Sequence, residues 1–542
     1  MMSKFNFSII LSLCYSFATV AQNNNEIPHL ITQGNATQLV VNQQPMLILG
    51  GELGNSSSST MDYMRPIWNK VKNNHLNTVI APVYWELIEP IEGQYNFDLV
   101  DSLIFEARNH QLKLVFLWFG AWKNSMSCYA PLWVKKDYNR FPRAKSKEGK
   151  SVEIMSPFSA NNLSIDQKVF AALMKHIKQV DAKEQTVVMI QVENEIGMLP
   201  SARDYSAEAE KAFKSAVPKE LMSYLQKNSN ALEADLAKRW KENGLKTSGN
   251  WEEVFGKSVA TDEFFMAWYY AAFTNSLTQA GKKEYPIPMY VNAALNRPNK
   301  LPGEYPSAGP LPHLFDLWKA AGTSIDFLSP DIYYPDFAHW TGLYKRKNNP
   351  LFIPEANKDT APDAKAFYAM GQHEAIGFSP FSVEDISEKE YLGRSYAVLE
   401  ELTPLILEKQ GKGLMAGVLL DGINQKDTLY LGYYKLIASH EYTLGWSPKA
   451  KEKATEWETV GAMIIQLAPD EFVIAGAGVV FTFEPKTAGE IAGIAQIDEG
   501  HYKNGKWIAG RRMNGDQDHQ GRHLRFTVGD YGIQRVKLYN YK

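Results

Sequence analysis

Two carboxylates stand two residues apart at the end of an apolar segment, residues 186–197 (TVVMIQVENEIG). Branched apolar residues alternate there with Met189, Gln191 and Glu193, which predicts a strand whose two faces meet different surroundings. Gln191 and Glu193 are predicted to face a shared interior, and Glu195 follows on that face where the strand ends. Because an unpaired buried charge is costly, this acidic end is either a salt-bridged part of the scaffold or the edge of an active site.

A further carboxylate, Glu355, follows Pro354 at the end of a later apolar segment. Proline cannot donate to a strand ladder, so the strand is predicted to end here and Glu355 to lie at its rim. The structural alternative is a carboxylate at a helix N-terminus. Two carboxylates at one rim match the cleavage of a glycosidic bond, which needs an acid for the leaving oxygen and a second carboxylate as nucleophile or base.

The two glutamates have different predicted roles. If they lie about 5–5.5 Å apart, the second carboxylate attacks the sugar and the configuration is retained. An ionised Glu355 raises the cost of ionising Glu195, so Glu195 is predicted to be the protonated acid/base and Glu355 the nucleophile. Glu193, one layer deeper, is predicted to orient its neighbours rather than to react.

Strands and helices alternate in a pattern that can bring these carboxylates together. The predicted strands lie at residues 45–53, 77–85, 113–118, 186–193, 288–293, 326–329, 351–355 and 376–381. The predicted helices between them lie at 61–74, 99–109, 166–180, 261–281, 314–322 and 362–372, with a long charged insertion at 201–256. This order predicts a (β/α)8 TIM barrel over residues 28–390, with catalytic residues at the carboxyl ends of the strands. A doubly wound sheet is the alternative, but no G-x-G-x-x-G follows the first strand.

Residues 391–542 are predicted to form a separate domain. After a helical stretch at 389–409, short β-rich segments follow at 415–420, 428–437, 472–477, 478–483, 493–498, 506–512, 524–528 and 535–539. One helix is predicted among them, at 455–467. The pattern indicates a mostly antiparallel β-sandwich. We expect it to pack on the barrel as a scaffold, with glycan binding as the second interpretation.

Composition excludes several classes of function. The 542 residues carry a net charge of −3, which gives no basic surface for nucleic acid. The 11 histidines show no metal-ligand spacing, and no H-E-x-x-H or cysteine cluster is present. Lys and Arg are nearly absent from the predicted strand ends, which argues against a phosphorylated substrate. We therefore expect neither a metal nor an organic cofactor.

Residues 1–21 have the features of an export signal. Lys4 precedes a mostly apolar segment, 5–17, and small residues stand before a cleavage point after residue 21. Cys14 raises the alternative of a lipoprotein signal, against which the bulky Leu13 argues. No later apolar segment is long enough to span a membrane, so we expect an exported protein, periplasmic or extracellular. The oligomeric state stays open.

The segment 191–197 (QVENEIG) resembles the acid/base motif Q-V-E-N-E-Y-G of glycoside hydrolase family 35, the β-galactosidases. Residues 85–97 resemble the W-x-x-H-E-P-x-x-G-x-[FY]-x-F stretch of that family, which is shared with the related family 42, and Ile88 stands where the family has His. The resemblance spans roughly the whole predicted barrel. It implies that Glu195 is the acid/base, that Asn194 donates to the sugar 2-hydroxyl and, by order along the chain, that Glu355 is the nucleophile.

The sequence departs from family 35 at positions that hold galactose hydroxyls there. Pro82 stands in place of a tyrosine, and residues 120–122 (GAW) lack the acid of the family's A-E-W. Trp122, Lys123 and Asn124 are therefore candidates for a different set of sugar contacts. Further candidate substrate contacts at predicted strand ends are Glu52, Trp85 and Tyr333. The tyrosine either hydrogen-bonds the nucleophile or caps the rim.

Together these inferences predict an exported retaining exo-β-galactosidase that acts on terminal β-galactosyl residues of oligo- or polysaccharides. The alternative within this chemistry is another retaining β-glycosidase of the same clan, agarase-like or arabinoside-cleaving. The alternative of a different class is a catalytically inactive carbohydrate-binding barrel. The presence of both Glu195 and Glu355 argues against it, because a binding protein needs no such pair.

Overall fold

The computed structural model describes residues 27–387 and 391–542, so the expected export signal at 1–21 lies outside the described residues. Eight of the described strands pair in parallel and close into a barrel, which confirms the predicted fold. In order around the barrel they are β4 (Ile48–Glu52), β5 (Thr78–Tyr84), β6 (Lys113–Lys123), β9 (Val187–Asn194), β10 (Met289–Ala294), β11 (Phe327–Ile332), β12 (Phe352–Ala356) and β13 (Gly377–Pro380). Each lies within a few residues of its predicted place, but β6 ends at Lys123 instead of residue 118.

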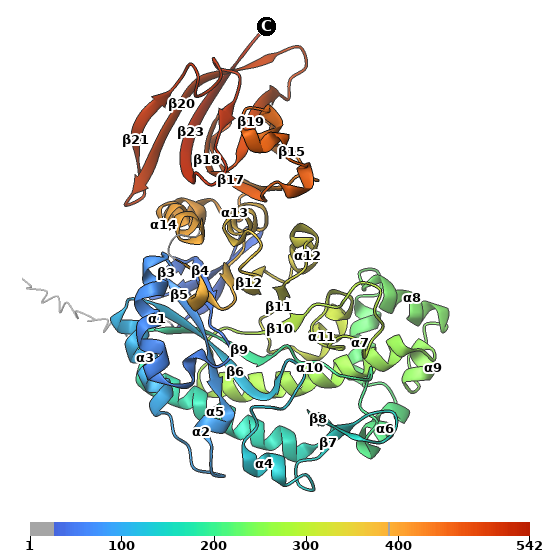
Figure 1. Cartoon of the computed structure of the whole chain (residues 1–542). Helices are drawn as coiled ribbons and strands as arrows, with labels where there is room; N and C mark the ends of the chain where they lie inside the picture. Colours follow the sequence, from blue (N-terminus) through green and yellow to red (C-terminus); the bar gives the residue numbers. More distant parts are fainter. Residues whose placement is uncertain (1–26, 388–390) are drawn as a thin grey trace, which may run out of the picture.

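Helices connect successive strands around the outside of the barrel (Figure 1). They are α1 (Met61–Asn73), α3 (Asp98–Asn109), α5 (Ala160–Asp181), α10 (Val259–Glu284), α11 (Phe315–Ala321), α12 (Phe337–Tyr344), α13 (Pro362–His373) and α14 (Tyr391–Lys409). Helix α1 shows why they form: the Thr60 side chain caps its first turn, and Met64, Ile67 and Val71 bury one face at helical spacing.

Shorter elements occupy the loops. The charged insertion is helical, with α6 (Ala207–Lys214), α7 (Lys219–Lys227), α8 (Ala234–Glu242) and α9 (Trp251–Phe255). Other short elements of the barrel domain are α2 (Trp85–Ile88), α4 (Leu132–Lys136), β7 (Arg143–Lys145), β8 (Ser151–Met155), η1 (Ser57–Ser59), η2 (Pro312–Leu314) and η3 (Val383–Asp385). No helix in the described ranges is both long and apolar enough to cross a membrane.

A small antiparallel sheet closes the N-terminal end of the barrel. Its strands are β1 (His29–Gln33), β2 (Ala36–Val41) and β3 (Gln44–Met46). Leu39 and Val41 are buried in the same cluster as Leu117 and Phe352 of barrel strands. The backbone N–H of Asn42 also donates to the side-chain Oε1 of Gln185, just before β9, at 2.7 Å. The opposite end, where the strands have their carboxyl termini, is therefore the one available for a site.

The C-terminal domain is a sandwich of two antiparallel sheets around a shared apolar core, as predicted. One sheet has the strands β14 (Met415–Leu420), β17 (Val460–Ala468), β18 (Glu471–Ala477), β23 (Gly532–Tyr541), β20 (Ile491–Lys503) and β21 (Lys506–Met513). The other has β15 (Lys426–Leu431), β16 (Tyr434–His440), β19 (Val479–Pro485) and β22 (Leu524–Arg525). Short 3₁₀ helices lie between strands, at η4 (Glu441–Leu444), η5 (Pro448–Lys451) and η6 (Ala454–Glu456).

Two predictions of elements in this domain are wrong. The helix predicted at 455–467 is strand β17. One of its faces packs in the sandwich core and the other, with Met463 and Ile465, packs toward the barrel, so the continuous apolar run carried no alternation to distinguish strand from helix. The segment 428–437, predicted as one strand, is a hairpin that turns at Gly432.

Helices α13 and α14 lie between the barrel and the sandwich (Figure 1). The Tyr396 hydroxyl of α14 donates to the carbonyl oxygens of Gly50 (2.9 Å) and Phe378 (2.8 Å), which fixes this helix to β4 and β13. On the other side, Tyr531 of the sandwich stacks on Phe367 of α13, with ring centroids 5.7 Å apart. The two domains are thus joined through the helices that flank β13.

We expect Gly371→Ala to destabilise the protein, although alanine normally stabilises a helix interior. A Cβ at Gly371 of α13 would lie 2.6 Å from the carbonyl oxygen of Ala416 in β14, and backbone cannot yield as a side chain can. The expected loss in unfolding free energy is about 1–3 kcal/mol, measured by urea denaturation. The matched control is Gly342→Ala in α12, where no atom lies within 4 Å of the new Cβ and a gain of about 0.5–1 kcal/mol is expected. Equal effects of the two substitutions would contradict the close packing of α13 on the sandwich.

Candidate active site

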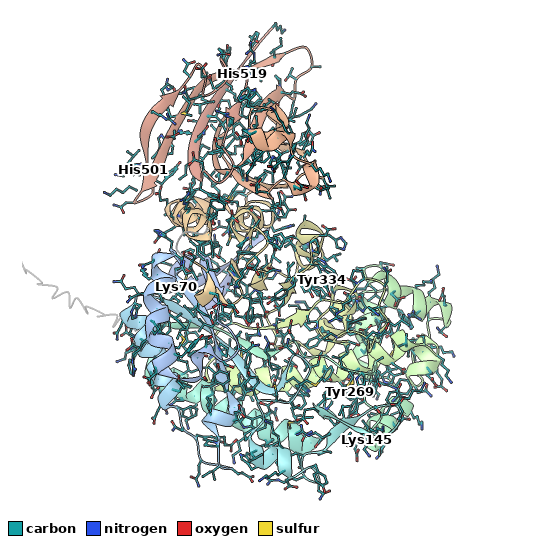
Figure 2. All side chains as sticks on the ribbon, in the orientation of Figure 1. Lys70, Lys145, Tyr269, Tyr334, His501 and His519 are labelled. Atoms are coloured by element: carbon teal, nitrogen blue, oxygen red, sulfur yellow. The ribbon has the colours of Figure 1, made fainter. Side chains whose placement is uncertain are left out.

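A cavity of about 480 Å³ lies at the carboxyl ends of the barrel strands. Its polar lining includes Lys123, Asn124, Glu195, Asp331, Tyr333 and Glu355. Tyr334, labelled in Figure 2, also lines it and lies on the barrel side of α13 and α14, whereas His501 and His519 mark the sandwich. The structure therefore brings both predicted catalytic glutamates to one cavity.

Three carboxylates meet in this cavity. Glu195, Asp331 and Glu355 are buried, and one oxygen of each lies within 4.8 Å of an oxygen of the other two. Retaining glycosidases place their two carboxyl groups about 5–5.5 Å apart, whereas inverting ones leave about 6.5–9.5 Å for a water. The distance between Glu195 and Glu355 thus suits direct attack on a sugar carbon.

Glu195 is held in place by both its backbone and its side chain. Its N–H donates to Oδ1 of Asn292 at 2.9 Å, and the Asn124 amide donates to its Oε2. Burial, and then the nearby Glu355 carboxylate, raises the pKa of Glu195 to about 7. The carboxyl group can therefore hold a proton near neutral pH and release it within the same range.

Glu355 lies at the end of β12 with its two oxygens in different surroundings. The Tyr333 hydroxyl donates to Oε1. Oε2 is buried and has no hydrogen-bond partner among the described residues. Tyr333 thus holds the carboxylate in one orientation and leaves its second oxygen available to a bound molecule. The nearby carboxylate also raises the pKa of Tyr333, after burial, so this hydroxyl remains a donor.

Asp331 is a third carboxylate that was not among the predicted site residues. The Asn292 amide donates to its Oδ2 at 2.5 Å, and its Oδ1 has no partner in the described structure. Burial, together with the Glu355 carboxylate, raises the pKa of Asp331 well above its ordinary value. Its position just past a predicted strand end could have indicated it. Lys123, a candidate contact from the sequence, is the last residue of β6 and lines the cavity.

Two of the predicted substrate contacts, Glu52 and Asn194, are buried at strand ends with unused hydrogen-bonding groups, but neither lines the cavity itself. Glu52, at the end of β4, has both oxygens unpartnered among the described residues, and burial and then Glu355 raise its pKa well above the ordinary value. Asn194, at the end of β9, has neither its amide nitrogen nor its oxygen bonded. Buried polar groups are almost always satisfied, so these atoms indicate a polar ligand.

The structure does not bring Trp85 and Trp122 to the cavity, which corrects the expectation that they bind substrate. The Trp85 indole donates to Glu89 at 2.9 Å and packs edge-on against Trp133. Trp122 packs against Phe273 of α10, with ring centroids 4.6 Å apart. Both rings lie between strands and the outer helices, because their positions in the strand or turn face away from the barrel axis.

Glu193 does not share the face of Gln191, as the alternation had predicted. Its φ of 62° breaks the strand pattern and turns its side chain toward Asp166 of α5. There its carboxylate accepts the backbone N–H of Trp122 at 2.7 Å and of Ala121 at 3.2 Å. Glu193 thus orients the end of β6, the kind of role predicted for it, from outside the cavity.

The trio of Glu195, Asp331 and Glu355 is, within residues 27–387 and 391–542, the group whose spacing could also hold a metal ion. Each of the three already accepts a hydrogen bond from a neutral side chain. The Lys123 ammonium lines the same cavity and adds a positive charge. Because each acid already accepts a hydrogen bond from a neutral donor, the chemistry below uses no metal.

Two family models match parts of the chain, each less than half of it. Residues 58–259 match the glycoside hydrolase family 42 model, described as beta-galactosidase. Residues 392–525 match a domain of unknown function, DUF5597. The resemblance to family 35 is corrected accordingly: the model that matches part of the barrel is that of family 42. A search of the curated proteins found no match.

Solved structures share the fold at low sequence identity. Gan42B, a GH42 beta-galactosidase, aligns over 95% of this chain and 100% of its own, with 11% identity and a TM-score of 0.50. A catalytic mutant of Gan42B from G. stearothermophilus aligns over 91% and 98%, with 12% identity and a TM-score of 0.47. The beta-galactosidase from Bacillus circulans sp. alkalophilus aligns over 67% of this chain, with 16% identity and a TM-score of 0.46. This chain spans only 57% of that protein's length. These similarities concern the fold alone.

We expect Glu195→Gln to stabilise the protein at pH 8 and to have little effect at pH 4.5. A carboxyl whose folded-state pKa is raised favours folding at low pH, and that stability is lost as the pH rises from the unfolded value through the folded value of about 7. Glutamine cannot ionise, so the gain at pH 8 is on the order of 3 kcal/mol. Urea denaturation at both pH values measures it. Glu242→Gln, on exposed α8, is the control with no expected pH dependence, and an equal gain at both pH values would argue against a buried, protonated Glu195.

Proposed function

We propose that this protein is an exported enzyme that hydrolyses terminal β-galactosides with retention of configuration. The observation that carries the proposal is the approach of Glu195 and Glu355 to within 4.8 Å at the ends of β9 and β12. The family 42 match over residues 58–259, described as beta-galactosidase, supports the sugar. Export is supported by the sequence of residues 1–21.

The first step uses the different surroundings of the two glutamates. Oε2 of Glu355, which has no hydrogen-bond partner within residues 27–387 and 391–542, attacks the anomeric carbon while Tyr333 holds Oε1. As the bond to the leaving oxygen breaks, Glu195 gives that oxygen its proton. The products are a free alcohol and a sugar esterified to Glu355.

The second step reverses the role of Glu195. Now ionised, it takes a proton from a water, which attacks the anomeric carbon on the face that the alcohol has left. The bond to Glu355 breaks and the sugar leaves with its original configuration. A pKa near 7 suits both donation and acceptance of a proton at neutral pH.

The unpartnered groups of the trio give the site its sugar-binding character. Asp331, which lines the cavity, places a buried acceptor where a ring hydroxyl can complete its hydrogen bonds. Small-ligand sites usually measure about 300–1,000 Å³. The cavity of about 480 Å³ lies in that range, which supports binding of a terminal sugar over a long stretch of polymer.

We expect a 2-deoxy-2-fluoro-β-galactoside with a dinitrophenyl leaving group to become attached to Glu355. The fluorine slows hydrolysis of the covalent intermediate, so mass spectrometry of the digested protein identifies the esterified residue. Glu355→Gln is expected to lose turnover by ~10⁴-fold and to take up no label. Glu86→Gln, whose carboxylate pairs with Lys135 outside the cavity, is the control. Label on Asp331 instead of Glu355 would identify Asp331 as the nucleophile. Faster hydrolysis of nitrophenyl α-arabinoside than of the β-galactoside would assign the alternative, arabinoside-cleaving function.

The catalytic efficiency kcat/KM is expected to fall above about pH 7, because deprotonation of Glu195 removes the acid. Glu195→Ala should abolish this decline and slow cleavage of a disaccharide by ~10²–10⁴-fold. A dinitrophenyl galactoside, whose leaving group needs no proton, should suffer much less in the first step. A pH–rate profile that keeps its decline near pH 7 in Glu195→Ala would exclude Glu195 as the titrating acid.

A further inference from the structure

Lys123 places a buried cation at the cavity of the proposed glycosidase. It is the last residue of β6, and its backbone lies opposite Asn194 of β9. Its backbone N–H donates to the carbonyl oxygen of Met126 at 2.8 Å, which fixes its position. The residue is only 5% exposed and lines the cavity beside Glu195 and Glu355. The side chain is therefore directed to the site by the local backbone.

The ammonium of Lys123 has no partner of its own among the described residues. No carboxylate oxygen lies within 4.0 Å of it, and no hydrogen-bond acceptor is close enough to bond it. The nitrogen lies over the Phe119 ring, 5.3 Å from the ring centroid. A buried ammonium without hydrogen bonds is unfavourable, so the contents of the cavity have to supply the acceptor.

Neutralising the cavity acids does not by itself explain Lys123. Glu52, Glu195 and Asp331 feel its charge, but burial already favours their neutral forms, as their raised pKa values show. A lysine placed only to balance them would be expected to contact at least one of them. Instead it stands apart from all three.

A second cation lines the same cavity at its rim. Arg297, in the loop after β10, is exposed and forms no ion pair or side-chain hydrogen bond within the described part of the chain. Its loop lies next to β11, which carries Asp331. The cavity therefore has an unpaired ammonium in its wall and an unpaired guanidinium at its entrance.

We propose that the glycoside cleaved by this site carries an anionic oxygen group, a carboxylate or a sulfate ester, which Lys123 binds inside the cavity with Arg297 at the rim. A neutral hydroxyl could accept a hydrogen bond from Lys123, but an anionic oxygen makes the stronger, charge-assisted bond and also compensates the buried charge. The neutral hydroxyls of the same sugar would bond Asp331, which lines the cavity. The inference rests on the proposed glycosidase function and narrows its substrate class.

Binding to a catalytically disabled chain tests the proposal without requiring turnover. Calorimetry on full-length Glu355→Gln would compare methyl β-galactoside with methyl β-galacturonide and with methyl β-galactoside 6-sulfate. At least one anionic ligand is expected to bind ~30-fold or more tightly than the neutral one, a difference typical of one buried charged contact. Adding Lys123→Met should remove most of that preference, and Lys123→Arg should retain part of it. Tighter binding of the galacturonide would identify the anionic group as a carboxylate, and tighter binding of the 6-sulfate would identify it as a sulfate ester.

Turnover by the chain with Glu355 intact gives a second, independent readout. The ratio of kcat/KM for the preferred anionic nitrophenyl glycoside to that for the neutral galactoside is expected to fall by ~30-fold or more in Lys123→Met. Lys135→Met is the matched control, because this lysine lies near Glu86 outside the cavity and its loss should leave the ratio unchanged. Equal binding of neutral and anionic ligands, or a preference that survives Lys123→Met, would overturn the proposal. Failure to cleave any glycoside, with the binding preference present, would instead overturn the glycosidase function.

Discussion

The confinement of several buried carboxylates around one cavity is the constraint on which the rest of the structure depends. Two full negative charges 4.8 Å apart would repel by about 3.5 kcal/mol at an effective dielectric constant of about 20, before any cost of burial. The fold relieves this cost by favouring neutral forms of Glu195, Asp331 and Glu52 and by placing neutral donors on the acids. An acid that is neutral in the resting protein can give up its proton during a reaction. The burial and mutual repulsion of the carboxylates, which raise their pKa values, therefore also provide the proton donor of the proposed reaction.

The backbone at the ends of β6 and β9 is bent to hold these groups. Positive φ angles occur at Asn124 (50°), Glu193 (62°) and Glu195 (45°), a conformation that side chains with a Cβ seldom adopt. Two hydrogen bonds clamp the strained ends together, from the Asn124 N–H to the Asn194 carbonyl at 3.2 Å and from the Ser125 N–H to the Glu195 carbonyl at 3.1 Å. Strain of this kind persists only where surrounding contacts enforce it. Here the contacts aim Asn124 at Glu195 and turn Glu193 out of the cavity.

The sandwich packs on helices α13 and α14, which lie between it and the barrel. Helix α13 follows β12, the strand that ends at Glu355, and packs on β14 and β17 with little space at Gly371 and Gly461. The Tyr531 hydroxyl donates to Asp363 in the first turn of the same helix. These contacts fix the segment that follows the nucleophile's strand. They are the contacts expected of a scaffold, the role first predicted for this domain.

The sequence by itself determined the order of strands and helices in the barrel, because alternating apolar periodicity and turn residues are local properties. It also identified Glu195 and Glu355, because acids at strand ends are conspicuous on an apolar background. Within the sandwich, β17 was mistaken for a helix, since a strand buried on both faces shows no alternation. Only the tertiary structure decided that Trp85 and Trp122 face the outer helices, that Glu193 turns away, and that Asp331 joins the cavity. Those outcomes depend on strand register, on three positive φ angles and on the true end of β6, which are set by contacts between residues far apart in the chain.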